Sequence, residues 1–292
     1  DGTSDSASKD LQITEVNDSP VLNNPGQVYY TDTEGEDNFT KRTGTLTASD
    51  RDAGSILSYT VNGGTDNGDG TVSADSEYGT LTVDKSTGDY EYAPHTDAIN
   101  ALSSDVTDNF QVAVSDGSGG TDSRTFTVEI SSVNDAPLLG GPSSTVTFTE
   151  NGSPVRIDPD VTLSDSEGVS YDSGFVSFST TENGEIDDHF VIQNTDGISV
   201  SGSEVSYSGT VIGSIDDNND GENGNDLRVN LNSEAYSPQV QALMRAVAFS
   251  NPTDTLSPDT RTVLLQVSDG GSGSNTAKYS TKEANVQVTE IN

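Results

Sequence analysis

One pattern constrains the fold of this protein more than any other, because it occurs three times. Each copy consists of an Asp-Gly loop, a segment in which apolar and polar residues alternate, and a short acidic linker. The copies lie at 1–20, 116–137 and 269–292. The linker residues Asn17 and Asn134 are 117 positions apart, and the next interval is 158 positions. Self-similarity at long, regular intervals is typical of tandem repeats.

The intervals predict three parts. Residues 1–20 are expected to be the last strand of a preceding repeat plus a linker, and complete repeats are expected at 21–136 and 137–292. A length of 292 residues suits two domains.

The repeat at 21–136 contains seven short segments with an alternation of apolar and polar residues, separated by clusters of Gly, Asn and Asp. These predicted strands are 27–30, 44–48, 57–61, 79–83, 90–92, 110–114 and 125–130. Short strands at such spacing indicate an all-β fold, an antiparallel Greek-key β-sandwich.

The repeat at 137–292 has the same organisation with an insertion. Ser237-Pro238 is a typical helix start, and apolar residues follow it at helical spacing. They are Val240, Leu243, Met244 and Val247. We expect one short helix at about 238–248, with its apolar face packed against the sandwich.

Charge is the second strong constraint. The sequence has 48 acidic and 12 basic residues, a formal net charge of −36. Such a protein repels phosphate, which argues against a nucleic-acid partner. Two carboxylates ~4 Å apart repel by roughly 4 kcal/mol at an effective dielectric constant near 20. A bound divalent cation turns this repulsion into attraction, so the sequence favours Ca²⁺ as the missing counter-charge.

Other features exclude whole classes of function. The sequence has no Cys, which excludes disulfides, thiol catalysis and the usual structural zinc sites. No apolar run approaches the length of a membrane span. The sequence begins at Asp1 without a visible signal peptide, and we expect it to be a segment of a longer protein. The only histidines, His95 and His189, fall in different predicted repeats, and no nucleophile motif is present, so we expect no enzyme.

Acidic residues recur at three places in each repeat. In a Greek-key sandwich, the incoming linker, the loop between the second and third strands and the last hairpin lie at one end. In the first repeat these segments contain Glu15, Asn17, Asp18, Asp50, Asp52 and Asp116. In the second they contain Asn134, Asp135, Asp165, Glu167 and Asp269. Ca²⁺ prefers carboxylate, amide and backbone oxygens, so each set is a candidate Ca²⁺ site; a solvated acidic loop explains any one of them alone.

These motifs resemble known families. The Val-Asn-Asp-x-Pro linkers and the Asp-x-Asp-x-Gly loop resemble cadherin-type repeats. The first repeat is more similar still to the VCBS repeat of giant bacterial surface adhesins, in the segments 44–54, 78–84, 87–92 and 110–117. The second resembles a cadherin-like repeat of RTX-type adhesins, in the segments 148–152, 163–168, 205–209 and 243–251.

The resemblance implies that these residues bind several Ca²⁺ ions at the domain junctions and stiffen the array. It also assigns an acidic position after each first strand, which matches Glu34 and Glu150. Glu34 would serve the junction between the two repeats, and Glu150 the next one. Glu167 departs from the family pattern, in which the loop has a second Asp.

Two loop tips require separate consideration. Asp216, Asn218 and Asp220 open a segment similar to an EF-hand loop, but Leu227 stands where the bidentate Glu is expected, and Asp226 precedes it. A Ca²⁺ loop and a plain solvated hairpin tip are both open. The tip at 65–70 is expected to be a turn.

The leading hypothesis is a non-catalytic, Ca²⁺-binding segment of an extracellular bacterial adhesin, with a role in cell adhesion and biofilm formation. The resemblance implies export by type I secretion, with the neighbouring repeats of the same protein as partners. The alternative makes the second repeat a Ca²⁺-dependent module for a peptide or glycan. Its candidate ligand-binding residues are Asp187, Asp188, Asp216, Asn218, Asp220 and Asp226.

Overall fold

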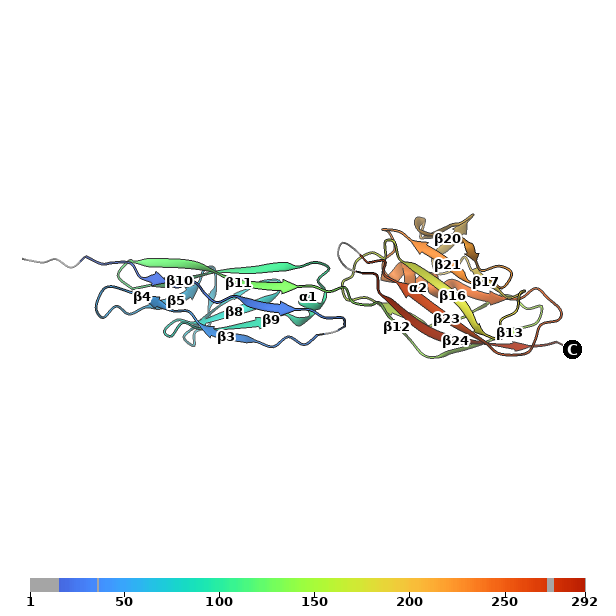
Figure 1. Ribbon diagram of the computed structural model, residues 1–292, viewed down its shortest axis with the longest axis horizontal. Coiled ribbons are helices and arrows are strands. Elements are labelled where there is room, and N and C mark those ends of the chain that lie inside the picture. The colour runs from blue at the N-terminus through green and yellow to red at the C-terminus, as the bar shows by residue number, and fades with distance from the viewer. Residues whose placement is uncertain (1–15, 36, 272–275, 292) are drawn as a thin grey trace, which may run out of the picture. The chain divides into compact units, whose positions relative to one another are not determined.

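The computed structural model describes residues 16–35, 37–271 and 276–291. Its contacts divide the protein into two compact units (Figure 1). Among the described residues, unit 1 comprises those up to Tyr30, Asn38–Thr96 and Val106–Ile130, and unit 2 comprises those of Thr31–Asp37, Asp97–Asp105 and from Ser131 onward. The repeat boundaries at 20/21 and 136/137 remain predictions. The strand expected before the first linker, and Glu15, lie outside the described residues.

Among the described residues up to Ser131, the regular secondary structure is almost entirely strand. The elements are β1 (Val21–Leu22), β2 (Val28–Thr31), β3 (Arg42–Thr45), β4 (Ala48–Ser49), β5 (Ser58–Val61), β6 (Thr65–Asp66), β7 (Thr71–Asp75), β8 (Gly79–Asp84), β9 (Asp89–Pro94), α1 (Thr96–Asn100), β10 (Val106–Ser115) and β11 (Thr121–Ser131). One sheet has the order β2-β11-β10-β5 and the other β3-β9-β8-β7-β6, while β1 pairs with β4.

The two sheets pack through aromatic residues. Tyr92 on β9 is fully buried, and its ring lies 6.0 Å from that of Phe110 on β10 and 6.5 Å from that of Phe126 on β11. The backbone passes from one sheet to the other four times, between β2 and β3, β3 and β5, β5 and β6, and β9 and β10. The predicted all-β Greek-key sandwich is therefore confirmed.

Six of the seven predicted strands occur, and the segment 44–48 is divided between β3 and β4. The prediction was also incomplete. The hairpin of β6 and β7 was missed, because β6 is only two residues long and flanked by Gly and Asp. Strand β6 occupies the first two residues of the segment 65–70, which was predicted as a turn. The short helix α1 was also unexpected.

Unit 2 is built on the same plan with a larger sheet. Its elements are β12 (Leu138–Gly140), β13 (Ser144–Thr149), β14 (Val155–Arg156), β15 (Thr162–Ser164), β16 (Phe175–Glu182), β17 (His189–Ile192), β18 (Ile198–Ser201), β19 (Glu204–Tyr207), β20 (Thr210–Asp220), β21 (Leu227–Leu231), α2 (Ser237–Ala246), β22 (Val247–Ser250), β23 (Arg261–Ser268) and β24 (Tyr279–Thr289). The large sheet has the order β13-β24-β23-β16-β21-β20-β19-β18, and β14-β22-β17 faces it.

Ring contacts join the two layers of unit 2. The rings of Phe148 on β13 and Phe249 on β22 are 5.3 Å apart, and those of Phe178 on β16 and Phe190 on β17 are 6.3 Å apart. One pairing departs from the predicted antiparallel pattern, since β13 runs parallel to β24.

The predicted helix is present as α2. It buries Val240, Leu243 and Met244, as the helical spacing indicated. The predicted end at 248 was too late, because Val247 begins β22, which pairs with β14 and β17. Among the described residues, no helix is long and apolar enough to cross a membrane.

Candidate metal centres

The first acidic set comes together at one end of unit 1. Asn17 Nδ2 donates to Asp116 Oδ2 (2.8 Å), the backbone N–H of Asp18 donates to Asp52 Oδ2 (2.7 Å), and the backbone N–H of Asp52 donates to Asp50 Oδ1 (2.8 Å). We call these five residues linker cluster 1. The linker, the loop and the last hairpin therefore meet, as the topology predicted.

Unit 2 repeats the arrangement. Asn134 Nδ2 donates to Asp269 Oδ2 (2.8 Å), and the backbone N–H of Asp135 donates to Glu167 Oε1 (2.5 Å). Glu167 thus accepts the bond that Asp52 accepts in unit 1, despite its longer side chain. We call Asn134, Asp135, Asp165, Glu167 and Asp269 linker cluster 2.

Hydrogen bonds within the last hairpin of each unit orient the side chains of Asp116 and Asp269. Asp116 follows β10 directly, and its Oδ1 accepts the backbone N–H groups of Ser118 and Gly120. These bonds hold one carboxylate oxygen in the turn and leave the other for the linker. The Asn17 amide lowers the pKa of Asp116, with the turn bonds adding to the effect. Asp269 is held in the same way, by the N–H groups of Gly271 and Lys278.

Both clusters contain buried carboxylate oxygens that lack a hydrogen-bond partner. Within the described residues these orphans are Asp50 Oδ2 in linker cluster 1 and Asp165 Oδ1 and Glu167 Oε2 in linker cluster 2. An unpaired buried oxygen is costly and needs an explanation, of which an absent ion is one. Carboxylate, amide and backbone oxygens are also the donors that Ca²⁺ prefers, so the residues fit this ion.

The electrostatics of linker cluster 2 also favour a bound cation. Burial, with Asp165 beside it, raises the pKa of Glu167 from its usual 4.5 to about 8. Two neighbouring carboxylates in a low-dielectric site cannot both stay charged cheaply unless a cation compensates them.

The clusters are not closed metal cages. In the described part of the protein, no three His, Cys, Asp or Glu side chains form a group ready to hold a metal ion.

A further acid was missed by the sequence analysis. Asp32 follows Tyr30-Thr31, as Glu150 follows Phe148-Thr149. Asp32 N–H donates to Ser131 O, as Glu150 N–H donates to Thr289 O, both at 2.9 Å. In the structure the residue that corresponds to Glu150 is therefore Asp32, two positions before Glu34. Glu34 is exposed and forms an ion pair with Lys278, and its role as a metal ligand stays a prediction.

The two matching acids also bind the next stretch of backbone in the same way. Asp32 Oδ2 accepts a long bond of 3.5 Å from the N–H of Val133, and Glu150 Oε2 accepts 2.9 Å from that of Ile291. Asp32 is fully buried, its Oδ1 is another orphan, and burial raises its pKa to about 6, with Asp135 contributing. The repeated aromatic-Thr-acid motif was the signal that could have found it.

The acidic tip forms a hairpin. Asp216, Asn218 and Asp220 lie on β20, which pairs with β21 through a bulge at 216–219. Asp216 Oδ1 accepts the N–H of Asn218, and Asp220 Oδ1 accepts that of Glu222. The segment is thus a hairpin, and Ca²⁺ binding at its tip stays a prediction. Asp226 ends the turn, and partial desolvation of its carboxylate raises its pKa.

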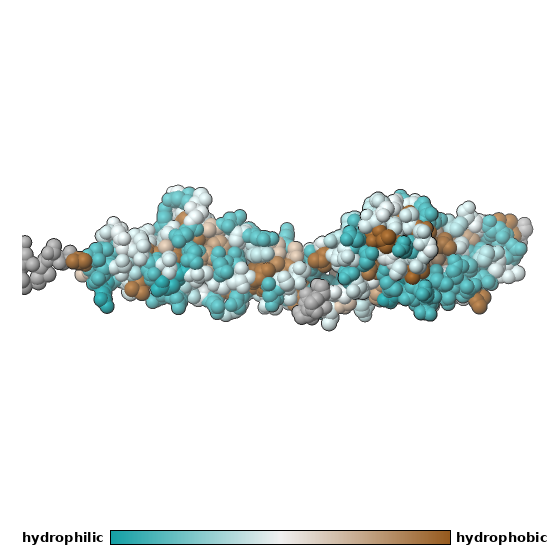
Figure 2. All heavy atoms as spheres, turned by 90° about the horizontal axis from the view of Figure 1, so that it is seen from above, coloured by the Kyte–Doolittle hydropathy of each residue, from teal (hydrophilic) through white to brown (hydrophobic). Residues whose placement is uncertain are grey.

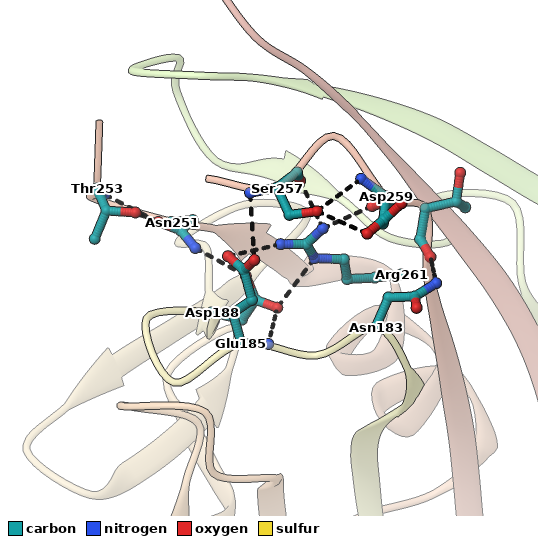
Figure 3. Close-up of polar contacts among 9 residues, drawn as sticks. Asn183, Glu185, Asp188, Asn251, Thr253, Ser257, Asp259 and Arg261 are labelled. Atoms are coloured by element: carbon teal, nitrogen blue, oxygen red, sulfur yellow. Dashed lines mark hydrogen bonds and ion pairs between the residues drawn. The ribbon is translucent and has the colours of Figure 1, made fainter. Parts of the chain in front are cut away.

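Asp188, a predicted ligand-binding residue, is instead part of a buried network (Figure 3). It is 4% exposed; its Oδ1 accepts from Asn251 Nδ2 (2.9 Å), and its Oδ2 accepts from Arg261 Nε (3.2 Å) and Glu185 N (2.9 Å). Both oxygens accept hydrogen bonds within this network, and a ligand-binding role for Asp188 stays a prediction. Asp187 beside it is exposed.

Arg261 is the centre of this network and was not predicted. It is fully buried, and its Nη1 donates to the backbone oxygens of Ser257 (2.7 Å) and Asp259 (2.6 Å). Its Nη2 lies 3.0 Å from Glu185 Oε2, near enough for an ion pair but not aligned as a hydrogen bond. Arg261 occupies an inward position of β23, and the buried Val263 and Leu265 follow it at alternate positions. This alternation was the sequence signal that could have predicted a buried arginine.

The histidines lie apart. His95 contacts Thr80, Asp75 and the backbone oxygen of Glu77, whereas His189 on β17 pairs with Glu222 at 2.8 Å.

Comparison with known proteins gives only distant likenesses. No protein-family model and no curated protein matches the sequence. Solved structures similar to this chain include protocadherin gamma B2 extracellular cadherin domains 3–6 (13% identity, TM-score 0.36, 94% of this chain and 52% of that one). Others are mouse cadherin-23 EC22–24 (13%, 0.33, 94% and 65%) and Drosophila N-cadherin EC1–3 (14%, 0.26, 94% and 69%). The protein thus spans about half to two thirds of these structures, and likeness at this level does not extend to ligands or partners.

Proposed function

We propose that this protein is a non-catalytic, Ca²⁺-binding segment of an extracellular bacterial adhesin. The observation that carries the proposal is the pair of linker clusters, in which the same contacts recur and buried carboxylate oxygens lack partners. In each cluster, residues of the linker bond to residues of a loop and a hairpin. An ion bound there would fix the linker to the sandwich and so stiffen the array of repeats.

The surrounding biology follows from the repeat resemblance and the composition. A protein with a charge of −36 suits a Ca²⁺-rich exterior, where ions would neutralise the acids. We infer a role in cell adhesion and biofilm formation, export by type I secretion, and neighbouring repeats of the same protein as partners.

Calorimetric titration with Ca²⁺ tests the proposal. Asp50→Asn and Asp165→Asn each remove one charge at an orphaned carboxylate, one in each cluster. Each variant should lose one class of site and keep the other. Asp254→Asn, an exposed position, is the matched control and should titrate like the parent protein. Absence of Ca²⁺ binding by the parent protein would refute the function.

A second function is favoured by one observation. A hollow of about 400 Å³ in unit 2 lies where the turn before β17 meets the acidic hairpin, with Glu185, Ile186 and Asn223 in its wall. Such a hollow suits a Ca²⁺-dependent peptide- or glycan-binding module. Peptide and glycan arrays probed with and without Ca²⁺ test this alternative, and absence of binding in both conditions would reject it.

A further inference from the structure

Five Asn-Gly pairs in the sequence have a chemistry of their own. They are Asn62-Gly63, Asn67-Gly68, Asn151-Gly152, Asn183-Gly184 and Asn223-Gly224. At such a pair the glycine nitrogen can attack the carbonyl carbon of the Asn side-chain amide. The new C–N bond closes a succinimide, the C–N bond of the amide breaks and ammonia leaves. Water then opens the ring to Asp or isoaspartate, so water is the only co-reactant.

Hydrogen bonds can block this attack at either reacting group. A side-chain amide that is held elsewhere cannot turn toward the backbone. Asn67 Nδ2 donates to the hydroxyls of Thr71 and Ser73, both at 2.8 Å, and Asn183 Nδ2 donates to Thr260 O at 2.8 Å. These two asparagines are therefore restrained.

The attacking nitrogen can be restrained as well, because a hydrogen-bonded N–H gives up its proton less readily. The N–H of Gly152 donates to Thr149 O (2.8 Å), and that of Gly224 donates to Asp188 O (2.9 Å). This protects the pairs that begin at Asn151 and Asn223.

Asn62-Gly63 has neither restraint. Within the described residues, the Asn62 side chain and the Gly63 N–H have no hydrogen-bond partner, and both residues are exposed. The pair forms the centre of a tight turn after β5, closed by the bond from Gly64 N to Val61 O (3.1 Å). We propose that Asn62 is the primary deamidation site of the folded protein.

The modification would alter the turn. Isoaspartate inserts a methylene into the backbone, and this turn has little space to absorb it. A Cβ added at Gly64 would lie 2.8 Å from Val61 Cγ1 and 2.9 Å from Ser73 O, so the backbone there already packs closely. Aged protein should therefore unfold in unit 1 at a lower temperature than fresh protein.

Peptide mapping by mass spectrometry tests the proposal. The whole protein is aged in mildly alkaline buffer, both folded and in denaturant, and each Asn-Gly peptide is followed with time. One net hydrogen bond slows a step by roughly fivefold. Asn62 should therefore react at least about fivefold faster than the other four in folded protein, and at a similar rate to them in denaturant.

Two outcomes would overturn the proposal. One is another pair that deamidates as fast as Asn62 in the folded protein; the other is the same order of rates in denaturant, which would place the cause in the local sequence. The variant Asn62→Gln is the control for unit 1. If its unfolding temperature falls on ageing as much as that of the parent, the damage arises elsewhere.

Discussion

The protonation state that the Glu167 carboxylate favours depends on whether an ion is bound. In the ion-free protein its carboxylate is half-buried, carries an orphaned oxygen and lies beside Asp165, so its pKa rises to about 8. In an ion-bound protein the same carboxylate would be a ligand and would have to be charged. Protons and Ca²⁺ should therefore compete at linker cluster 2.

This competition predicts a pH dependence with a definite sign. Between its usual pKa of 4.5 and about 8, Glu167 binds more protons in the folded protein than in the unfolded one. The stability that this protonation contributes is fully present below 4.5 and is lost as the pH rises through 8. Chemical denaturation in EDTA should thus show a free energy of unfolding that falls across this window, and saturating Ca²⁺ should flatten the fall.

The matched variants are Glu167→Gln and Glu204→Gln, the second on an exposed strand position. Glu167→Gln should be more stable than the parent at pH 8 in EDTA and should bind Ca²⁺ more weakly. A Glu167→Gln profile that coincides with the parent profile would assign the pH dependence to other groups.

Asp32 and Glu34 provide a second test at single residues. Asp32 is buried with an orphaned oxygen, whereas the Glu34 side chain is 66% exposed. Because Ca²⁺ affinity follows the number of charged ligands, Asp32→Asn should weaken binding at one site by about tenfold or more, and Glu34→Gln should change it little. Isothermal titration of both variants measures these Ca²⁺ affinities. A larger loss of affinity in Glu34→Gln than in Asp32→Asn would identify Glu34 as the ligand.

At the scale of elements, local pattern predicted what local sequence determines. Alternation located six strands before β12, and helical spacing located α2, because each depends on residues close together in the sequence. The parallel pairing of β13 with β24 was missed, since it joins segments about 140 residues apart. Linker contacts were foreseen because the Greek-key order dictates them, but the Arg261 network is a long-range arrangement that only the folded protein displays.

The Arg261 network should determine the stability of unit 2. Removing one partner of a buried ion pair leaves the other charge uncompensated, at a cost of about 3–5 kcal/mol. We therefore expect Arg261→Ala to destabilise unit 2 by this amount in urea denaturation. Arg261→Lys should restore little, because an ammonium cannot reproduce the spread of guanidinium donors.

Arg156→Ala is the control for this effect. Arg156 pairs with Asp196 at 2.8 Å, but both side chains are more than a third exposed, and such pairs contribute about 0–1 kcal/mol. Equal effects of the two substitutions would mean that burial of Arg261 does not set the stability.

Over the whole molecule, the charge opposes folding. Figure 2 shows a largely hydrophilic face with apolar residues in small separate patches. With a net charge of −36 over 292 residues, repulsion among surface carboxylates favours expansion of the polypeptide. Two different effects can reduce this repulsion. Salt screens all surface charges, whereas Ca²⁺ binds specifically at the linker clusters.

Thermal melting distinguishes screening by salt from specific Ca²⁺ binding. With Ca²⁺ at a hundredfold excess over its dissociation constant, each site should add about 2.7 kcal/mol of stability. The unfolding temperature should therefore rise strongly in millimolar Ca²⁺ relative to EDTA, and much less in Mg²⁺, which requires closer octahedral geometry. NaCl at matched ionic strength should produce only the small rise due to screening. If NaCl reproduced the whole effect of Ca²⁺, the acidic residues would be a diffuse charge and not binding sites, and the repeated contacts of the two linker clusters would have a purely structural role.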